Sequence, residues 1–222
     1  EKKAKSKSKH EKESSTLSKN IIIISIAIIF LLFISTIFAI LNINNSKVIS
    51  GVCIENVDLS NLTKEEVSDL VNNKLLTIKE VEFSYNNYST VVKLEEIGLE
   101  ISPKKAINSA INLGKTNNII IDNYSILKAN ILKTKFELEI KIDEEKFEET
   151  VQNIQAEIPE AIKEYSYIIK DNELIITNGK SGEKILKEEL RRAIITNIKE
   201  QFNGNIRVVN IITRYEEPKE ID

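Results

Sequence analysis

The chain has 222 residues and a formal net charge of −3, with 34 acidic residues against 31 lysines and arginines. Its single cysteine excludes an intrachain disulfide, and its single histidine argues against a zinc site built on histidine. The acidic balance argues against a nucleic-acid partner, which would require clustered lysine and arginine.

The first twenty residues form a basic tail. Residues 1–20 contain seven lysines and three glutamates, so this tail carries +4 and the remaining residues carry −7. Lysines beside an apolar segment favour the cytoplasmic side of a membrane. The sequence therefore predicts a basic cytoplasmic tail over residues 1–20.

An uncharged apolar run follows the tail. The run from Ile21 to Leu41 contains only three polar side chains, those of Ser25, Ser35 and Thr36. At ~1.5 Å per residue, a helix of this length spans roughly 30 Å, the hydrocarbon thickness of a bilayer. The run predicts a single transmembrane helix over residues 21–41, in contact with the lipid bilayer, and an extracellular C-terminal region.

A cleaved signal peptide is the alternative interpretation of the same run. Signal peptides usually have an apolar region of ~7–15 residues, followed by a cleavage motif of small residues. Here the run is longer, and the segment from Leu41 to Asn45 contains no Ala-x-Ala pattern. The sequence favours an uncleaved anchor over a cleaved one.

The next part of the chain has the pattern of a small α+β domain over residues 46–130. A strand pattern over Gly51–Asp58 precedes a helix that begins near Thr63, where Thr63 and Glu66 match a capping box. Two strand patterns, Gly98 and a second helix follow. The strands are expected at 81–85 and 90–94, around a turn at Asn86–Asn87, and the second helix is expected at 102–114.

The same order recurs over residues 131–218. Asp58 and Gly98 are 40 positions apart, and Asp143 and Gly182 are 39 apart, which indicates a duplicated unit of about 85 residues. In this second copy the strands are expected at 136–143, 165–169 and 173–176. Asp143 is expected to cap the first helix, and the last helix is expected at 187–202, followed by a closing strand at 206–212.

These patterns predict an α+β fold class, with an N-terminal single transmembrane helix followed by two similar small α+β domains. Each domain is expected to bury one face of its first helix. The buried residues are Val67 and Leu70 in the first domain, and Phe147 and Val151 in the second.

Four segments carry a family resemblance: Gly51–Glu66, Ile97–Leu99, Ala110–Gly114 and Ile175–Gly182. Together they resemble the peptidoglycan-binding domain of bacterial surface proteins. That domain occurs, usually in two copies, in VanW-like proteins, which are named for a vancomycin-resistance accessory protein, and in a group of L,D-transpeptidases. Two positions depart from the pattern of this domain. Leu186 stands where an aspartate commonly caps a helix, and Cys53 replaces what is often an aromatic residue.

The resemblance implies a protein of the cell wall. It extends from about Ile49 to Pro218 and implies a membrane-anchored binding or spacer module whose partner is peptidoglycan or another wall component. On this interpretation the chain is the front half of a VanW-like protein. One alternative is the anchor and substrate-presenting half of an L,D-transpeptidase whose catalytic domain follows Asp222. Another is a structural stalk without glycan affinity.

The sequence predicts no catalytic residue, cofactor or metal site. An L,D-transpeptidase catalytic domain would show His-Gly-Thr and Ser-x-Gly-Cys motifs, and neither occurs. His10 lies in the basic tail, so no histidine can activate a nucleophile outside the cell. Asn178–Gly182 indicates a turn rather than a phosphate loop, because Leu174 stands where that motif needs glycine. Residues 1–222 are therefore expected not to form an enzyme.

Two further groups of residues receive structural interpretations. Cys53 lies between Val52 and Ile54, which predicts a buried apolar residue rather than a reactive thiol. Adjacent glutamates near the starts of predicted helices favour a solvated helix face over a general acid–base pair. These pairs are Glu65–Glu66, Glu144–Glu145, Glu148–Glu149 and Glu188–Glu189.

Four tyrosines are the candidate ligand-binding residues. They are Tyr85, Tyr88, Tyr165 and Tyr167, all in or beside predicted strands. Their aromatic faces can stack on sugar rings. The alternative is that they are half-buried residues of a sheet, because tyrosine is common in strands.

Overall fold

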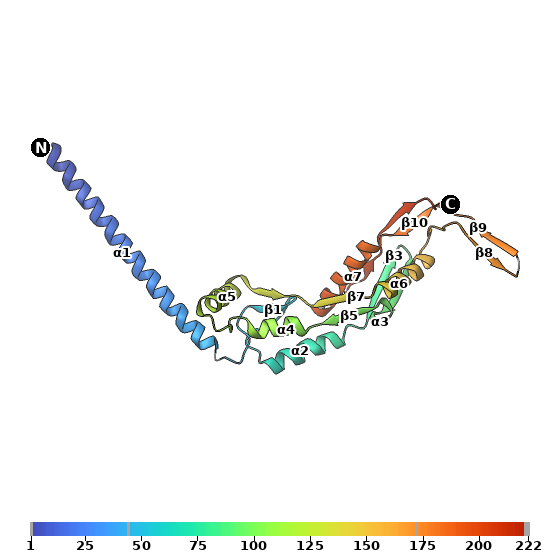
Figure 1. Cartoon of the computed structure of the whole chain (residues 1–222), viewed down its shortest axis with the longest axis horizontal. Helices are drawn as coiled ribbons and strands as arrows, with labels where there is room; N and C mark the ends of the chain where they lie inside the picture. Colours follow the sequence, from blue (N-terminus) through green and yellow to red (C-terminus); the bar gives the residue numbers. More distant parts are fainter. Residues whose placement is uncertain (1, 44, 172, 220–222) are drawn as a thin grey trace. The chain divides into compact units, whose positions relative to one another are not determined.

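The computed structural model describes residues 2–43, 45–171 and 173–219, with side chains from Lys19 onward except those of residues 39 and 42–43. It has a mixed α+β fold (Figure 1), as the sequence predicts. The helices are α1 Lys2–Ile43, α2 Lys64–Leu76, α3 Leu94–Ile97, α4 Lys104–Asn112, α5 Ile119–Leu132, α6 Glu144–Glu157 and α7 Lys187–Phe202. The strands are β1 Val52–Ile54, β2 Val57–Asp58, β3 Glu80–Tyr85, β4 Tyr88–Lys93, β5 Leu99–Ser102, β6 Thr134–Phe136, β7 Glu139–Ile142, β8 Ser166–Lys170, β9 Glu173–Thr177, β10 Gly182–Ile185, β11 Val209–Asn210 and β12 Thr213–Glu216.

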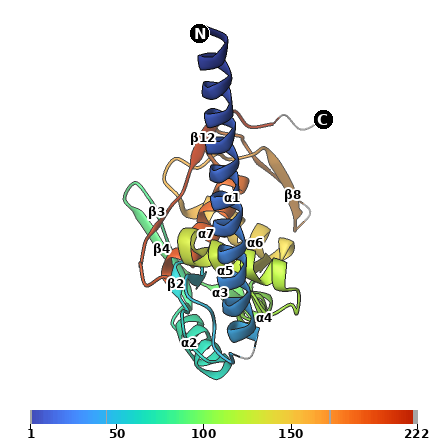
Figure 2. The ribbon, with the colours of Figure 1, turned by 90° about the vertical axis from the view of Figure 1, so that its left-hand side faces the viewer.

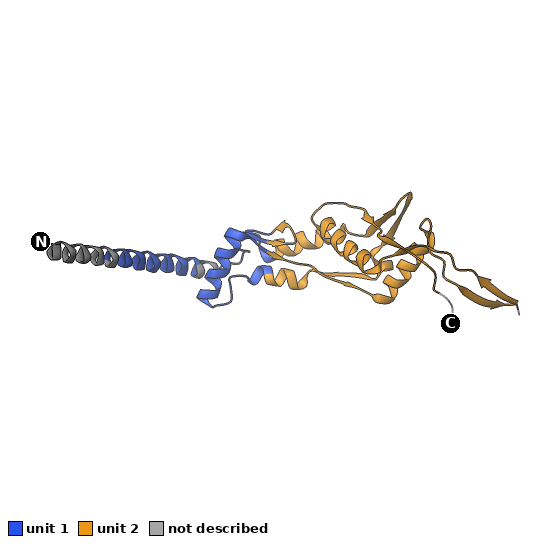
Figure 3. Ribbon diagram, turned by 90° about the horizontal axis from the view of Figure 1, so that it is seen from above, with its two compact units in different colours: residues 1–52, 59–64, 110–134 blue, residues 53–58, 65–109, 135–222 orange. Residues whose placement is uncertain are grey.

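The chain forms two compact units, each assembled from segments that are distant in the sequence (Figure 3). Unit 1 contains residues 1–52, 59–64 and 110–134, and unit 2 contains residues 53–58, 65–109 and 135–222. The order of a helix, a two-stranded hairpin, a glycine and another helix occurs in both halves of the sequence. The division into similar tandem domains at 46–130 and 131–218 stays a prediction.

Unit 1 contains the apolar run as part of one continuous helix, α1. Within the described part of the chain, α1 is the one helix that is long and apolar enough to cross a membrane, over Lys19–Phe38. No side chain of this 20-residue segment is buried. Helix α5 lies beside the C-terminal half of α1 (Figures 1 and 2).

Helix α5 was not predicted from the sequence. The side chain of Asn118 caps it by accepting hydrogen bonds from the N–H groups of Ile120 and Ile121, each at 3.2 Å. The Asp122 carboxylate accepts two more, from the backbone N–H and the hydroxyl of Thr116, at 2.9 and 2.7 Å. Because large apolar residues occur on all sides of this helix, its sequence shows no amphipathic period.

The main sheet of unit 2 has the strand order β11-β3-β4. Strands β3 and β4 pair antiparallel around a turn in which Asn86 has a φ of 50°, as predicted for this hairpin. The closing strand predicted at 206–212 is wrong in extent. Instead, β11 pairs in parallel with β3, and β12 pairs antiparallel with β10 in a second sheet.

Helices and strands both contribute large side chains to the core of unit 2. Phe83 of β3, Phe147 of α6 and Phe202 of α7 are fully buried. Helix α6 begins as predicted, since the Asp143 carboxylate accepts a hydrogen bond from the Lys146 N–H at 3.0 Å. Val67 and Val151 are buried as predicted, with exposures of 0% and 2%, whereas Leu70 is only half-buried.

A buried carboxylate fixes the turn between β1 and β2. Glu55 is 1% exposed, and its Oε1 accepts a hydrogen bond from the Leu138 N–H at 2.9 Å. The ammonium groups of Lys135 and Lys199 lie 3.2 and 3.6 Å from its carboxylate oxygens. Burial lowers the pKa of Lys199, but hydrogen bonding to Glu137 and the charge of Glu55 outweigh it, so this pKa is raised overall. Lys199 therefore stays charged beside Glu55.

The first prediction concerns Gly98, which has a φ of +74°. A Cβ at this position would lie 2.7 Å from the Cβ of Asp143, whereas at Gly204, with a φ of +92°, it would meet nothing within 4 Å. Gly98→Ala and Gly204→Ala both incur the ~1–2 kcal/mol cost of a left-handed conformation. Gly98→Ala should lose a further ~1–3 kcal/mol through overpacking. Urea denaturation of the two detergent-solubilised variants measures the difference, and equal midpoints would contradict the close packing.

The second prediction concerns the α6 face that packs into the core. Phe147→Ala should lower the free energy of unfolding by ~3–5 kcal/mol, because it leaves a cavity in the core. Gln152→Ala, at an exposed position of the same helix, should change it by less than ~0.5 kcal/mol. Circular dichroism during urea denaturation reports both values. Similar small losses for both variants would show that the assigned register of α6 is incorrect.

Candidate functional site

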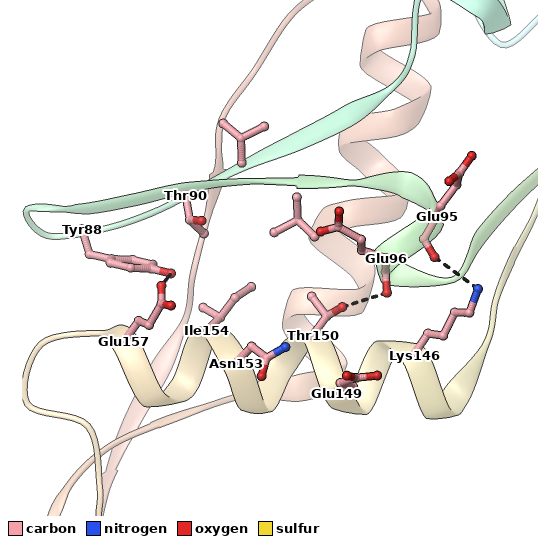
Figure 4. A pocket seen from close by; sticks show the side chains of 12 residues that line it. Tyr88, Thr90, Glu95, Glu96, Lys146, Glu149, Thr150, Asn153, Ile154 and Glu157 are labelled. Carbon is pink, nitrogen blue, oxygen red and sulfur yellow. Dashed lines mark hydrogen bonds between the residues drawn. The ribbon is translucent and has the colours of Figure 1, made fainter.

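A polar groove within unit 2 lies between β4, α3 and α6 and has a volume of about 450 Å³ (Figure 4). Strand β4 and the short helix α3 form one side of it, and α6 forms the other. Its lining residues are Tyr88, Thr90, Val91, Val92, Glu95, Glu96, Lys146, Glu149, Thr150, Asn153, Ile154 and Glu157. We call it the α6 groove.

Side chains of α6 hold α3 in place at one end of the α6 groove. The Thr150 hydroxyl donates a hydrogen bond to the Glu96 carbonyl oxygen at 3.1 Å, and the Lys146 ammonium donates one to the Glu95 carbonyl oxygen at 3.4 Å (Figure 4). Both carbonyls belong to the last turn of α3, and the Glu95 carbonyl also accepts a hydrogen bond from the Gly98 N–H at 3.2 Å. The groove wall is therefore fixed by backbone contacts, which leave the carboxylates of Glu95 and Glu96 available.

Tyr88 lies at the other end of the α6 groove. Its hydroxyl donates a hydrogen bond to Glu157 Oε2 at 2.9 Å (Figure 4). Burial raises the pKa of Tyr88, and the hydrogen bond to Glu157 raises it further, because the phenolate would lie beside a carboxylate. Tyr88 therefore remains a neutral donor, with its ring at the groove edge.

The charge of the α6 groove is predominantly negative. Four carboxylates line it, those of Glu95, Glu96, Glu149 and Glu157, against the single ammonium of Lys146. Such a lining favours hydroxyl, amide and ammonium groups of a ligand and disfavours anions. The groove can bind polar ligands, but its lining contains no histidine, cysteine or serine to act as a nucleophile or its base.

Cys53 and the paired glutamates have the environments that the structural interpretations predict. Among the described residues, no group of three or more histidine, cysteine, aspartate or glutamate side chains could hold a metal ion. Cys53 is buried, as predicted. Four of the paired glutamates form ion pairs, as expected of a solvated face: Glu144 and Glu188 with Arg191, Glu148 with Lys187, and Glu189 with Arg192.

The four tyrosines predicted as ligand-binding residues do not form one site. Of these, Tyr88 alone lines the α6 groove. Tyr85 lies opposite Tyr88 in the β3–β4 register, and its hydroxyl accepts a hydrogen bond from Thr213 at 3.3 Å. Tyr165 lies beside Gly179 and Pro218, and Tyr167 is on β8 with 61% of its surface exposed.

Strands β8 and β9 form an exposed hairpin that carries Tyr167. Every described residue in the two strands is exposed. The register places Tyr167 opposite Ile176, and Ile169 opposite Leu174, so these four side chains share one face. The hairpin is a second surface on which an aromatic ring is available for stacking.

The carboxylates of the α6 groove were not predicted to act together. Glu95 and Glu96 belong to α3, and Glu149 and Glu157 to α6, about 50 positions later. In the sequence, the glutamates of α3 and those of α6 each have the pattern of a solvated helix surface. The fold brings them to one groove through the contact between α3 and α6.

One comparison with known protein families gives a match. Residues 90–207 match the family described as "Putative peptidoglycan binding domain". No curated protein and no solved structure matches the chain. A domain of this kind is non-catalytic and implies an extracellular or cell-wall location. The matched residues extend from β4 to α7 and make up more than half of the chain, so the chain belongs to this family of peptidoglycan-binding domains.

Proposed function

We propose that this chain is a membrane-anchored, non-enzymatic module that binds peptidoglycan through the α6 groove. The observation that carries the proposal is the coincidence of the family match with the groove. All the lining residues except Tyr88 lie within residues 90–207. Binding of the cell wall is the function that the family implies.

The chemistry of the groove suits a cell-wall polymer. Peptidoglycan presents hydroxyl and acetamido groups on its glycan strands and free amino groups on its peptides. The carboxylates of Glu149 and Glu157 can accept hydrogen bonds from hydroxyl and amino groups. The ring of Tyr88 offers a flat apolar face for a sugar ring. Tyr85, Tyr165 and Tyr167 are further candidates for stacking, outside the groove.

The anchor and its topology are part of the same proposal. The apolar segment of α1 crosses the cell membrane once, the basic tail remains in the cytoplasm, and everything after Asn45 lies outside. The tandem domains act as a binding or spacer module in the front half of a VanW-like protein. The alternative of an L,D-transpeptidase front half has the same anchor and differs in the domain that would follow.

The third prediction tests binding through the groove. The detergent-solubilised chain should sediment with purified peptidoglycan, and Tyr88→Ala should weaken this binding about tenfold, which corresponds to ~1.4 kcal/mol. Glu149→Lys should also weaken it, because it replaces an acceptor in the groove with a positive charge. Glu65→Lys makes the same charge change at an exposed site on α2, outside the groove, and should bind normally.

The result of this assay separates the candidate functions. No sedimentation of the unsubstituted chain would support a structural stalk and refute the proposal. Loss of binding in Tyr167→Ala but not in Tyr88→Ala would place the site on the exposed hairpin. Equal effects of Glu149→Lys and Glu65→Lys would show that only overall charge matters.

The fourth prediction tests the topology. Protease added to intact, wall-stripped cells should digest the region after Asn45 and spare a tag attached at residue 1. The reason is that the lysines of residues 1–20 favour the cytoplasmic side, and no lysine follows Leu41 until Lys47. Lysed cells, in which protease should also remove the tag, provide the control. Protection of the C-terminal region in intact cells would refute the proposed orientation.

A further inference from the structure

Helix α5 of unit 1 has two different faces. One face is buried and includes Asp122, Ile126 and Ala129, with exposures of 0%, 5% and 0%. Four large residues lie on the opposite face, within one stripe at 3.6 residues per turn. They are Ile120, Tyr124, Leu127 and Ile131, and 80%, 68%, 54% and 75% of their surfaces are exposed. We call this the α5 stripe.

The neighbours of the α5 stripe are also apolar. Ile119, Ile121 and Leu132 of the same helix are exposed by 42%, 52% and 74%. A contiguous apolar surface of this kind usually marks a contact with another protein or with a membrane. The buried face is already packed within unit 1, where the Ile126 side chain lies directly beside Gly114.

The apolar surface of helix α1 lies next to the α5 stripe and indicates what covers it. An apolar groove of about 640 Å³ lies between the two helices. Its lining includes Leu31, Leu32 and Phe38 of α1, and Ile126 and Leu127 of α5. Leu127 belongs both to this groove and to the stripe, so the stripe continues directly onto the apolar surface of α1.

The charges of unit 1 agree with a lipid neighbour. After the apolar run, the segments of this unit contain five lysines and one acidic residue, Asp122, which is buried. Lys128 lies beside the stripe on α5, and Lys133 follows the end of the helix, and both are exposed. Lysines that flank an apolar helix face can extend to the phosphates of lipid headgroups.

We propose that α5 lies in the outer interface of the membrane, with the α5 stripe in contact with lipid acyl chains. The occupant of this surface is the bilayer that α1 crosses, so the inference rests on the proposed membrane anchor. Lys128 and Lys133 contact headgroup phosphates at the same level. The chain is then held to the membrane by one spanning helix, α1, and one interfacial helix, α5. The second contact restricts rotation of the rest of unit 1 about the axis of α1.

Spin labels test this arrangement in the complete chain. A nitroxide is attached to Tyr124→Cys or Ile131→Cys in a Cys53→Ala background, and the protein is reconstituted in vesicles of phosphatidylethanolamine and phosphatidylglycerol. Collision with oxygen, which partitions into lipid, is compared with collision with a water-soluble nickel complex. Gln152→Cys, at an exposed position of α6, is the matched control for a label in water, and Ile29→Cys reports the anchor itself.

The expected result is higher oxygen and lower nickel accessibility at residues 124 and 131 than at residue 152. Equal nickel accessibility at all three positions, with the label at residue 29 in lipid, would overturn the interfacial helix and leave the anchor intact. Nickel access at residue 29 would refute the anchor and the interfacial helix together. Shielding of residues 124 and 131 from both reagents, with dipolar broadening between labels, would show that a second copy covers the stripe.

Discussion

The hydrogen bond from the Asp143 N–H to the Gly98 carbonyl, 2.9 Å long, is the contact on which the α6 groove depends. Gly98 ends α3 in a left-handed conformation, and Asp143 caps the start of α6. The two helices approach so closely that a Cβ at Gly98 would lie 2.7 Å from that of Asp143 and 2.9 Å from that of Lys146. The end of one helix therefore defines where the other begins. Glycine at this position sets the width of the groove.

Charge is distributed unevenly between the two compact units. Unit 2 contains 30 acidic residues and 19 lysines or arginines, whereas unit 1 contains more basic than acidic residues even without the tail. This division suits a unit 1 beside lipid phosphates and a unit 2 whose groove accepts hydroxyl and amino groups.

The sequence predicted the elements that have strong local signals. The β3–β4 hairpin, the Asp143 cap of α6 and the buried Phe147 are all found where the pattern placed them. Leu186, identified as a departure from the resembled family, indeed provides no side-chain hydrogen bond to the start of α7. In each of these cases the determining interaction lies within a few positions along the chain.

The missed features depend on contacts between distant segments. Helix α5 has apolar residues on every side, so its sequence lacks the polar face that identifies most helices. Of the closing strand predicted at 206–212, only Val209–Asn210 is a strand, which pairs with β3, and the next strand, Thr213–Glu216, pairs with β10 in another sheet. The groove joins residues of α3 to residues of α6, and only the packing of those helices makes their carboxylates neighbours.

The proposed anchor lowers the affinity for the cell wall that the α6 groove needs. An open groove that offers carboxylates and one aromatic ring gives modest affinity, because each hydrogen bond with a sugar replaces one with water. A chain fixed in the membrane, however, meets the wall at an effective concentration set by the short distance between them. Weak contacts then suffice for association, and rapid release lets the chain sample successive sites on the polymer. A tightly closed, high-affinity pocket would instead hold the membrane to a single point of the wall.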